Sequence, residues 1–336
     1  MTESSKILSV QNLSTFFETE QGTAKSVQDV SFDIEKAKTM ALVGESGCGK
    51  SVTALSIMRL IPSPPGRIAS GKILFKERNI FEFSEKQMRK IRGNKIAMIF
   101  QEPMTSLNPV YTIGQQIIEA ITLHQKKSER QAWAMAEEML AKVHIPEPAR
   151  RLNEYPHLLS GGMRQRVMIA MAISCKPSLL IADEPTTALD VTIQAQILDL
   201  LDELQQSEHM SILLITHDLG VVAQRADFVA VMYASRIAEK CSCKELFDNP
   251  LHPYTQGLLK SLPQLGAKQN RLNTIAGNVP EPLNFPSGCK FHPRCPIGFN
   301  DKRCQTVEPE LREVSDNHFV ACWYAPGYEK DNEKKV

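Results

Sequence analysis

The hydrophobic residues of this chain gather in short runs that end at polar residues. Four such runs are Met40–Val43, Ile96–Phe100, Leu179–Asp183 and Ile212–Ile215. Apolar runs of this length predict buried β-strands, and the helical segments among them predict a parallel sheet that is covered by helices. The pattern therefore places the chain in the α/β class.

Helical spacing and turn signals organise the segments around these runs. Val52–Leu60 predicts a helix directly after the first run, and Ser128–Val143 predicts another from apolar residues three and four positions apart. Residues 7–33 are strand-rich, with a turn near Gln21–Gly22. From Pro250 onward proline and glycine become frequent and helical periodicity fades, which predicts a separate, small and irregular C-terminal extension.

The residues after the first predicted strand match the phosphate-binding pattern G-x-x-x-x-G-K-[ST]. The motif consists of Gly44, Glu45, Ser46, Gly47, Cys48, Gly49, Lys50 and Ser51, and Val52 continues it into the predicted helix. Glycines let several backbone N–H groups converge on one anion, and the helix N-terminus adds positive potential there. Lys50 can reach the β- and γ-phosphates of a nucleotide, and the Ser51 hydroxyl can bind Mg²⁺.

Three further segments carry the chemistry of nucleotide hydrolysis. Asp183 ends the third apolar run, where it would hold Mg²⁺ through water, and Glu184 would polarise the attacking water. His217 follows the fourth run at the position of a γ-phosphate contact. A second anion-binding nest opens a predicted helix and consists of Ser160, Gly161 and Gly162.

The order of these motifs resembles the ATP-binding subunit of an ABC transporter over roughly the first 250 residues. Leu159–Met163 resembles the ABC signature and Ala188–Asp190 the D-loop. Gln101 resembles the Q-loop glutamine, and His217 resembles the switch histidine. The resemblance implies a P-loop ATPase core with an antiparallel β subdomain and a helical subdomain at residues 102–160.

The resemblance also implies the role of each residue in the site. Ser51, Gln101 and Asp183 would hold Mg²⁺. Glu184, Gln101 and His217 would act in hydrolysis.

Nucleotide contacts beyond the phosphates also follow from the resemblance. Phe17 lies about where the family stacks an aromatic ring on adenine, but the adjacent Phe16 is an alternative, and either ring could be a core residue. In the family, ATP is buried between two ATPase subunits. Ser160 and Gly162 would therefore bind the γ-phosphate of a nucleotide held by the partner subunit.

Further sequence segments narrow the resemblance to the ATPases of dipeptide and oligopeptide importers. These are Gln101–Pro109, Tyr155–His157 and Pro250–Thr255, although nickel and glutathione importers share much of them. Leu158 and Ser235 depart from the family pattern, which commonly has a polar residue and a glycine there, and we expect both to be surface or turn changes. The resemblance implies an ATPase domain at residues 1–249, a peptide-importer extension at 250–326 and a charged tail at 327–336.

Four of the eight cysteines fall within the predicted extension, at Cys289, Cys295, Cys304 and Cys322. A cytosolic protein with clustered thiols favours a metal over disulfides, and thiolates suit either Zn²⁺ or an iron–sulfur cluster. The resemblance favours a [4Fe–4S] cluster, with zinc or unmetallated thiols as alternatives. His292 lies inside this frame, where we expect a local hydrogen bond.

Composition and charge restrict the partners. The net charge of +1 gives no electrostatic reason for a nucleic-acid or anionic-lipid partner, and no apolar run approaches the roughly 20 residues of a membrane span. Composition agrees with a soluble, cytosolic enzyme, and the resemblance implies a peripheral location at the cytoplasmic face of the inner membrane. The resemblance implies two integral membrane permeases, a second ABC ATPase (a homodimer being the alternative) and, indirectly, an extracytoplasmic solute-binding protein.

The function that the resemblance implies is ATP hydrolysis that drives import of dipeptides or oligopeptides. Nickel, glutathione or antimicrobial peptides are alternative solutes, because the solute does not touch this subunit. A soluble ABC ATPase of DNA repair or translation is a remote alternative, since such proteins usually carry two ATPase units or a long coiled-coil insertion and a basic surface. A redox-sensing role for the clustered cysteines would be an addition to the ATPase.

Overall fold

The computed structural model describes residues 5–101, 106–187, 189–262 and 274–328. The chain divides into two compact units. The first unit comprises Met1–Ile7, Ile34–Lys38 and Asn79–Ile215. The second comprises Leu8–Asp33, Thr39–Arg78 and Thr216–Val336.

An antiparallel sheet belongs mainly to the second unit. Its strands are β1 (Lys6–Thr19), β2 (Gly22–Glu35), β4 (Gly66–Phe75) and β5 (Arg78–Asn79), in the order β2-β1-β4-β5. In the β1–β4 pair, Phe17 lies opposite Gly66. The two residues between β1 and β2 form a turn, which confirms the turn predicted near Gln21–Gly22.

The second unit also contains five strands that lie side by side in the order β11-β12-β10-β9-β3. They are β3 (Thr39–Val43), β9 (Phe228–Tyr233), β10 (Arg236–Ser242), β11 (Arg312–Ser315) and β12 (His318–Val320). β3 and β9 are parallel and the other pairs are antiparallel. The helices of this unit are α1 (Lys50–Ile57), α9 (Leu219–Arg225), α10 (Cys243–Asp248), α11 (Pro253–Lys260), α12 (Lys302–Thr306) and the short η3 (His292–Arg294).

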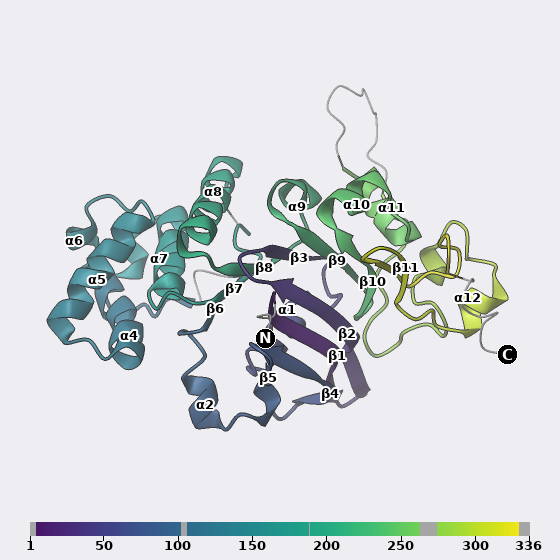
Figure 1. Ribbon diagram of the computed structural model, residues 1–336, viewed down its shortest axis with the longest axis horizontal. Helices are drawn as coiled ribbons and strands as arrows, with labels where there is room; N and C mark the ends of the chain where they lie inside the picture. The colour runs from purple at the N-terminus through teal and green to yellow at the C-terminus, as the bar shows by residue number, and fades with distance from the viewer. Residues whose placement is uncertain (1–4, 102–105, 188, 263–273, 329–336) are drawn as a thin grey trace. The chain divides into compact units, whose positions relative to one another are not determined.

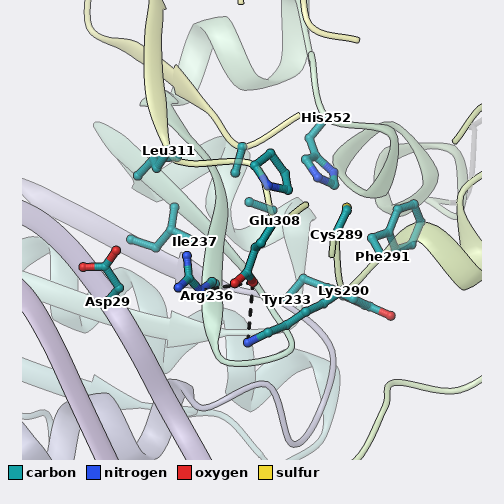
Figure 2. A pocket seen from close by; sticks show the side chains of 13 residues that line it. Asp29, Tyr233, Arg236, Ile237, His252, Cys289, Lys290, Phe291, Glu308 and Leu311 are labelled. Atoms are coloured by element: carbon teal, nitrogen blue, oxygen red, sulfur yellow. Dashed lines mark ion pairs between the residues drawn. The ribbon is translucent and has the colours of Figure 1, made fainter. Parts of the chain in front are cut away.

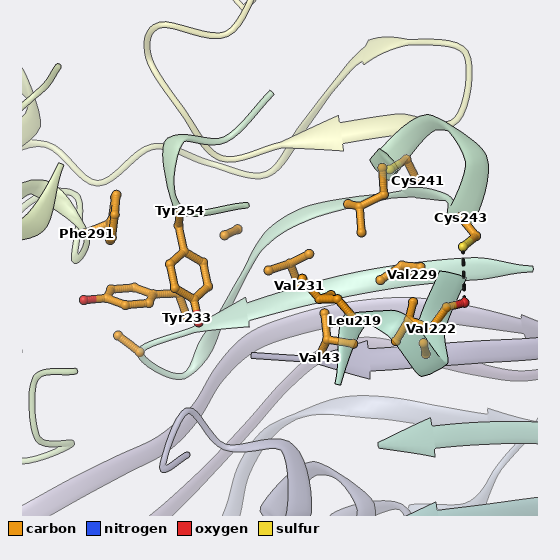
Figure 3. Packing of buried hydrophobic residues seen from close by; sticks show 14 of the residues in the cluster. Val43, Leu219, Val222, Val229, Val231, Tyr233, Cys241, Cys243, Tyr254 and Phe291 are labelled. Atoms are coloured by element: carbon orange, nitrogen blue, oxygen red, sulfur yellow. Dashed lines mark hydrogen bonds between the residues drawn. The ribbon is translucent and has the colours of Figure 1, made fainter. Parts of the chain in front are cut away.

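A hydrophobic cluster forms the core of the second unit beside these strands (Figure 3). Val43, Val229 and Val231 contribute from the strands, and Leu219 and Val222 from α9. These side chains are buried to 95 % or more. Their burial stabilises the sheet on which the phosphate loop begins.

The first unit contains the parallel strands β6 (Ile96–Ile99), β7 (Leu179–Asp183) and β8 (Ser211–Thr216), with β7 in the middle. Its helices are η1 (Ile80–Glu82), α2 (Glu85–Arg89), α4 (Ile113–Gln125), α5 (Glu129–Lys142), α6 (Pro148–Arg151), η2 (Pro156–Leu158), α7 (Gly161–Ile173) and α8 (Val191–Glu208). β7 is fully buried, as the continuous apolar run predicts.

Helices α4 to α7 lie together in one group (Figure 1), and α4 to α6 fall in the segment before Ser160 that is predicted to be helical. Ser128 caps α5 and forms a capping box with Gln131, so the predicted helix Ser128–Val143 is confirmed with its caps at those two residues. The ring of Trp133 covers Gly114 of α4, where a Cβ would come within 2.2 Å of the ring. Only glycine allows this approach of α4 and α5.

Three local predictions need correction. The helix predicted to reach Leu60 ends at Ile57, because Arg59 has the left-handed φ of 51°. The strand predicted to end at Phe100 ends at Ile99, and Phe100 is 40 % exposed. The segment after Pro250 is more regular than predicted, since it forms α11 and α12 and adds β11 and β12 beside β10.

The predicted charged tail lies outside the described residues from 329 onward. In the described part of the chain, every helix is too short or too polar to span a bilayer.

Candidate functional site

The predicted site residues belong to both units. Lys50, the rest of the phosphate loop, His217 and Phe17 lie in the second unit. Gln101, Asp183, Glu184 and the Ser160–Gly162 nest lie in the first.

The phosphate loop follows the buried strand β3 and leads into α1, as predicted. Gly44, Gly47 and Gly49 have φ values of 150°, 79° and 105°. A Cβ on Gly44 would lie 2.2 Å from the Met232 carbonyl oxygen, and one on Gly49 would lie 2.3 Å from the carbonyl oxygen of Ser26. Gly44 and Gly49 are thus required both by conformation and by space, and Gly47 by conformation alone.

The Lys50 side chain curls back along this loop and is 5 % exposed. Its Nζ donates to the Gly44 carbonyl at 2.8 Å and to the Glu45 carbonyl at 3.1 Å. Cys48, beside it, is fully buried, and this burial raises the pKa of its thiol. Cys48 is therefore a neutral packing residue of the loop.

Acidic residues of the first unit stand at the carboxyl end of β7. Asp183 is 4 % exposed, and Glu184 follows it with φ 45°. Glu184 Oε2 accepts hydrogen bonds from Gln101 Nε2 at 3.0 Å and from Thr187 Oγ1 at 2.9 Å. The structure thus brings together Gln101 and Glu184, which lie far apart in the sequence, and fixes the orientation of the carboxylate.

The signature segment begins α7 in the same unit. Ser160 is the N-cap of α7, and its Oγ accepts from the Met163 N–H at 3.4 Å. A Cβ on Gly162 would lie 2.9 Å from Ile193. The α7 residue Gln165 donates to the Pro185 carbonyl at 2.6 Å, which ties the helix to the residues after Glu184.

The D-loop is described in part, because residue 188 lies outside the described residues. Asp190 accepts a hydrogen bond from the Ile193 N–H and caps α8.

Aromatic and histidine candidates of the second unit occupy surface positions. His217 is exposed after β8. Phe16 and Phe17 are both half-buried. Arg67 covers the Phe16 ring, with Cζ 5.5 Å from its centroid. Because neighbouring strand residues point to opposite faces, Phe17 lies on the other face from this pair.

The four predicted cysteines interact electrostatically with one another, and all are free. Burial is the largest cause that raises the pKa of Cys289 to about 12 and those of Cys304 and Cys322 to about 11. The Gly298 N–H donates to Cys295 Sγ at 3.2 Å. His292 Nδ1 lies 2.9 Å from the Cys289 carbonyl oxygen, which confirms the local hydrogen bond expected for it.

A pocket lies beside the first of these cysteines (Figure 2). Lys290 is buried there and pairs with Glu308, which also pairs with Arg236. Burial lowers the pKa of Lys290 to about 8. The opposite charges around this pocket balance each other, so it does not select an ion of one sign.

Glu239, Cys241 and His318 form another buried group whose candidate ligand atoms lie within 4.8 Å of one another. Glu239 already accepts from His318 Nε2 at 2.7 Å and from the backbone N–H groups of Leu251 and His252. Burial by itself would raise the Glu239 pKa, but these hydrogen bonds outweigh it and lower the pKa. The group therefore serves as a tether that joins β10, β12 and the start of α11.

Comparison with known proteins identifies the family. Residues 27–187 match the ABC transporter family model, and residues 238–304 match the C-terminal region of oligopeptide/dipeptide transporters. The chain is 53 % identical to a dipeptide transport ATP-binding protein of Bacillus subtilis (strain 168), over 95 % of this chain and 94 % of that one. It is 48 % identical to a dipeptide transport ATP-binding protein of Escherichia coli (strain K12), over 95 % and 96 %.

The chain belongs to the ATP-binding subunits of ABC transporters.

Solved structures agree with this ABC fold. A dimeric ATP-binding cassette bound to ADP and phosphate has a TM-score of 0.63 at 24 % identity, covering 70 % of this chain and 98 % of that one. The structure of cbiO1 from Clostridium perfringens, part of an ABC transporter complex, has a TM-score of 0.62 at 27 % identity, covering 73 % and 92 %. The match to the dimeric cassette, at 24 % identity, shows the fold alone. That this subunit is an ATPase follows from its membership of the family.

Two residues beside the ABC phosphate loop were missed by sequence analysis. Arg294 donates to both carboxylate oxygens of Glu45, and the Tyr254 hydroxyl accepts from the Glu45 N–H. Both lie more than 200 positions from Glu45, and no local pattern marks them. Ser235, expected at the surface or in a turn, is in a turn but fully buried, and its N–H donates to the Cys48 carbonyl.

Proposed function

We propose that this ABC ATPase energises the import of dipeptides or oligopeptides through membrane permeases. The match of residues 238–304 to the oligopeptide/dipeptide transporter region supports this solute class. A further relative, 51 % identical over 95 % of this chain and 97 % of its own length, is named an oligopeptide transport ATP-binding protein of Bacillus subtilis (strain 168). The chain would act at the cytoplasmic face of the cell membrane, with two permeases and a second ATPase.

Glu184 is the residue that directs water in this proposal. Gln101 and Thr187 hold one carboxylate oxygen, which fixes the carboxylate as a general base for the attack on the γ-phosphate. Lys50 binds the phosphates, and the exposed His217 contacts the γ-phosphate. Phe17 stacks on adenine, and the Ser160–Gly162 nest binds the nucleotide of the partner ATPase.

Ser51, Gln101 and Asp183 hold Mg²⁺ in this proposal, because hydroxyl, amide and carboxylate oxygens are the kinds of ligand that this hard cation binds. The Asp183 carboxylate is buried at the end of β7. When bound, the ion neutralises charge that develops on the phosphates.

Replacing Glu184 by glutamine tests the hydrolytic role. The amide oxygen of the new side chain can still accept from Gln101 and Thr187, so the local geometry should persist while the base is lost. ATP turnover should fall about 10²-fold or more, equivalent to about 2.7 kcal/mol in the barrier. ATP should still bind, whereas Lys50→Ala should weaken binding itself. Turnover at the wild-type rate in Glu184→Gln would show that another group activates the water.

Uptake measurements test the solute. A strain that lacks this chain should lose uptake of labelled dipeptide, and the wild-type gene should restore uptake while Glu184→Gln should not. Unchanged peptide uptake together with a defect in nickel or glutathione uptake would refute the peptide assignment.

Purification from native membranes should recover two permeases and a second ATPase. Recovery of ribosomal or repair proteins without a permease would contradict the transporter role.

The four cysteines hold a [4Fe–4S] cluster in this proposal, within a C-terminal extension that begins at residue 250. A Cβ on Gly298 would lie 3.0 Å from Cys304 Sγ and 3.4 Å from Cys295 Sγ, so the absence of a side chain leaves room between them. Zn²⁺ at about 2.3 Å from each thiolate would bring the sulfurs within about 3.8 Å of one another. Among the described cysteines, no three sulfurs lie within 4.8 Å of one another, which suits a larger group.

Metal analysis of anaerobically purified protein tests the cluster. Iron and acid-labile sulfide should be present at about four atoms each per chain and be lost in Cys304→Ser. Cys175→Ser is the control, because Cys175 is a buried cysteine of the first unit and does not belong to this set. Stoichiometric zinc, or no metal at all, would refute the cluster.

A further inference from the structure

Arg294 lies between the phosphate loop and the cysteines, and every nitrogen of its guanidinium group donates a hydrogen bond. Nη1 and Nη2 donate to Glu45 Oε2 and Oε1 at 2.8 and 3.0 Å. Nε donates to the Ala276 carbonyl at 2.9 Å, Nη2 to the Ile275 carbonyl at 3.3 Å, and Nη1 to the Tyr233 hydroxyl at 3.4 Å. These contacts occupy all five N–H donors of the guanidinium.

This ion pair is well shielded from water. The Arg294 side chain is 5 % exposed, and that of Glu45 is 31 % exposed. A bidentate, largely buried arginine–carboxylate pair fixes direction as well as distance. Glu45 is the residue after Gly44, so its position sets the path of the phosphate loop.

The backbone of Glu45 is held as well. Its N–H donates to the Tyr254 hydroxyl at 2.9 Å. Tyr254 contacts Tyr233 and Phe291, with ring centroids 4.6 and 5.4 Å away, and all three rings lie at one end of the core cluster (Figure 3). Phe291 lies two residues after Cys289. We call residues Gly288–Thr306, which contain Cys289, Cys295 and Cys304, the cysteine segment. The rings of Tyr254, Tyr233 and Phe291 thus connect the phosphate loop to this segment.

A third connection runs from Lys290 to the other end of the loop. Lys290 Nζ donates to the Ala234 carbonyl at 3.0 Å, and the next residue, Ser235, donates from its N–H to the Cys48 carbonyl at 3.0 Å. The cysteine segment therefore contacts the phosphate loop region through Lys290, Phe291 and Arg294, which are close in sequence and lie between the first two cysteines.

We propose that Arg294 is a positioning residue that couples nucleotide binding at the phosphate loop to the order of the cysteine segment. Arg294 holds Glu45 so that the loop is preorganised for phosphate, and a bound nucleotide in turn stabilises the segment that carries Arg294. Such coupling is reciprocal by thermodynamic necessity. The inference requires nucleotide binding but not peptide as the solute.

Titration of the full chain with ADP and Mg²⁺ in a calorimeter tests the first half of the proposal. Arg294→Gln should weaken ADP binding about tenfold, the size of one lost charge-assisted contact pair. Arg294→Lys should weaken it less than Arg294→Gln does, because an ammonium keeps the positive charge opposite Glu45 although it cannot make both contacts. Arg303→Gln is the matched control, because Arg303 also precedes a cysteine but covers the Trp323 ring instead. Its ADP affinity should equal that of the wild type.

A double-mutant cycle with Glu45→Gln distinguishes coupling from general damage. The Glu45→Gln and Arg294→Gln effects on ADP affinity should be non-additive, because each removes the same pair. Additive effects, or wild-type affinity in Arg294→Gln, would overturn the proposal. If Arg294→Gln does not fold, the cycle is measured with Arg294→Lys under the same criteria.

Hydrogen–deuterium exchange tests the reciprocal half. Saturating ADP should slow amide exchange in the cysteine segment several-fold in the wild type and in Arg303→Gln. This protection should disappear in Arg294→Gln. Exchange in the wild type that does not respond to ADP, or protection that survives in Arg294→Gln, would overturn the coupling. A failure of peptide transport would leave both measurements unaffected, so the two proposals fail separately.

Discussion

Ser235 occupies a position whose backbone conformation favours glycine. It is the second residue of the two-residue loop Ala234–Ser235, which joins β9 to β10 and has φ values of 43° and 73°. Two positive φ values are those of a type I′ turn, where glycine is preferred at the second position. We predict that Ser235→Gly stabilises the protein.

The magnitude follows from three terms. An L-residue in the left-handed region costs about 1–2 kcal/mol. The buried Ser235 hydroxyl has no hydrogen-bond partner among the described residues, at a cost of about 1 kcal/mol. Glycine gives the unfolded chain more conformational entropy, and this offsets about 1 kcal/mol of the gain. The backbone contacts to Cys48 and Gln28 need no side chain. The net gain should be about 1–2 kcal/mol.

Urea unfolding and thermal scans of three proteins measure this gain. The unfolding midpoint should rise in Ser235→Gly. Ser235→Ala removes the hydroxyl but keeps the strain, so its stability should lie between those of the wild type and Ser235→Gly. Because the N–H to Cys48 is kept, ADP affinity should not fall. The argument is wrong if Ser235→Gly is less stable than Ser235→Ala.

Two further predictions concern buried groups. Burial lowers the pKa of His252 from 6.5 to about 4, so the imidazole binds a proton more weakly in the folded state than in the unfolded chain. The protein therefore loses stability as the pH falls below 6.5. At pH 5 the loss in unfolding free energy should be about 2 kcal/mol. His252→Asn keeps an N-cap for α11. Between pH 7 and pH 5, the unfolding free energy of this variant should fall less than that of the wild type. An unchanged pH dependence would exclude His252 as the cause. Gly114→Ala would force a Cβ into the Trp133 ring and should destabilise the protein by about 1–3 kcal/mol in urea unfolding. Gly161→Ala is the control, because its Cβ would meet only Leu189 at 3.7 Å, and an equal loss in both variants would refute the steric argument.

Local patterns predicted much of the fold. The four apolar runs became β3, β6, β7 and β8, because a run of four or five apolar residues has few other ways to be buried. The helix Ser128–Val143 was delimited by its own capping residues. Helix and strand ends that depend on a left-handed residue, such as Arg59 after α1, were not visible in the pattern.

Short sequence motifs by themselves predicted the chemistry of the candidate site. Phosphate loops and acid pairs recur in short segments because their function requires a few residue types at fixed spacing. The tertiary structure alone decided which distant residues support them. Gln101 reaches Glu184 across 83 positions, and Arg294 reaches Glu45 across 249, through contacts that no local spacing encodes. It also decided that Ser235 is buried against the phosphate loop, because burial depends on which elements pack together and not on the residue's neighbours in the chain.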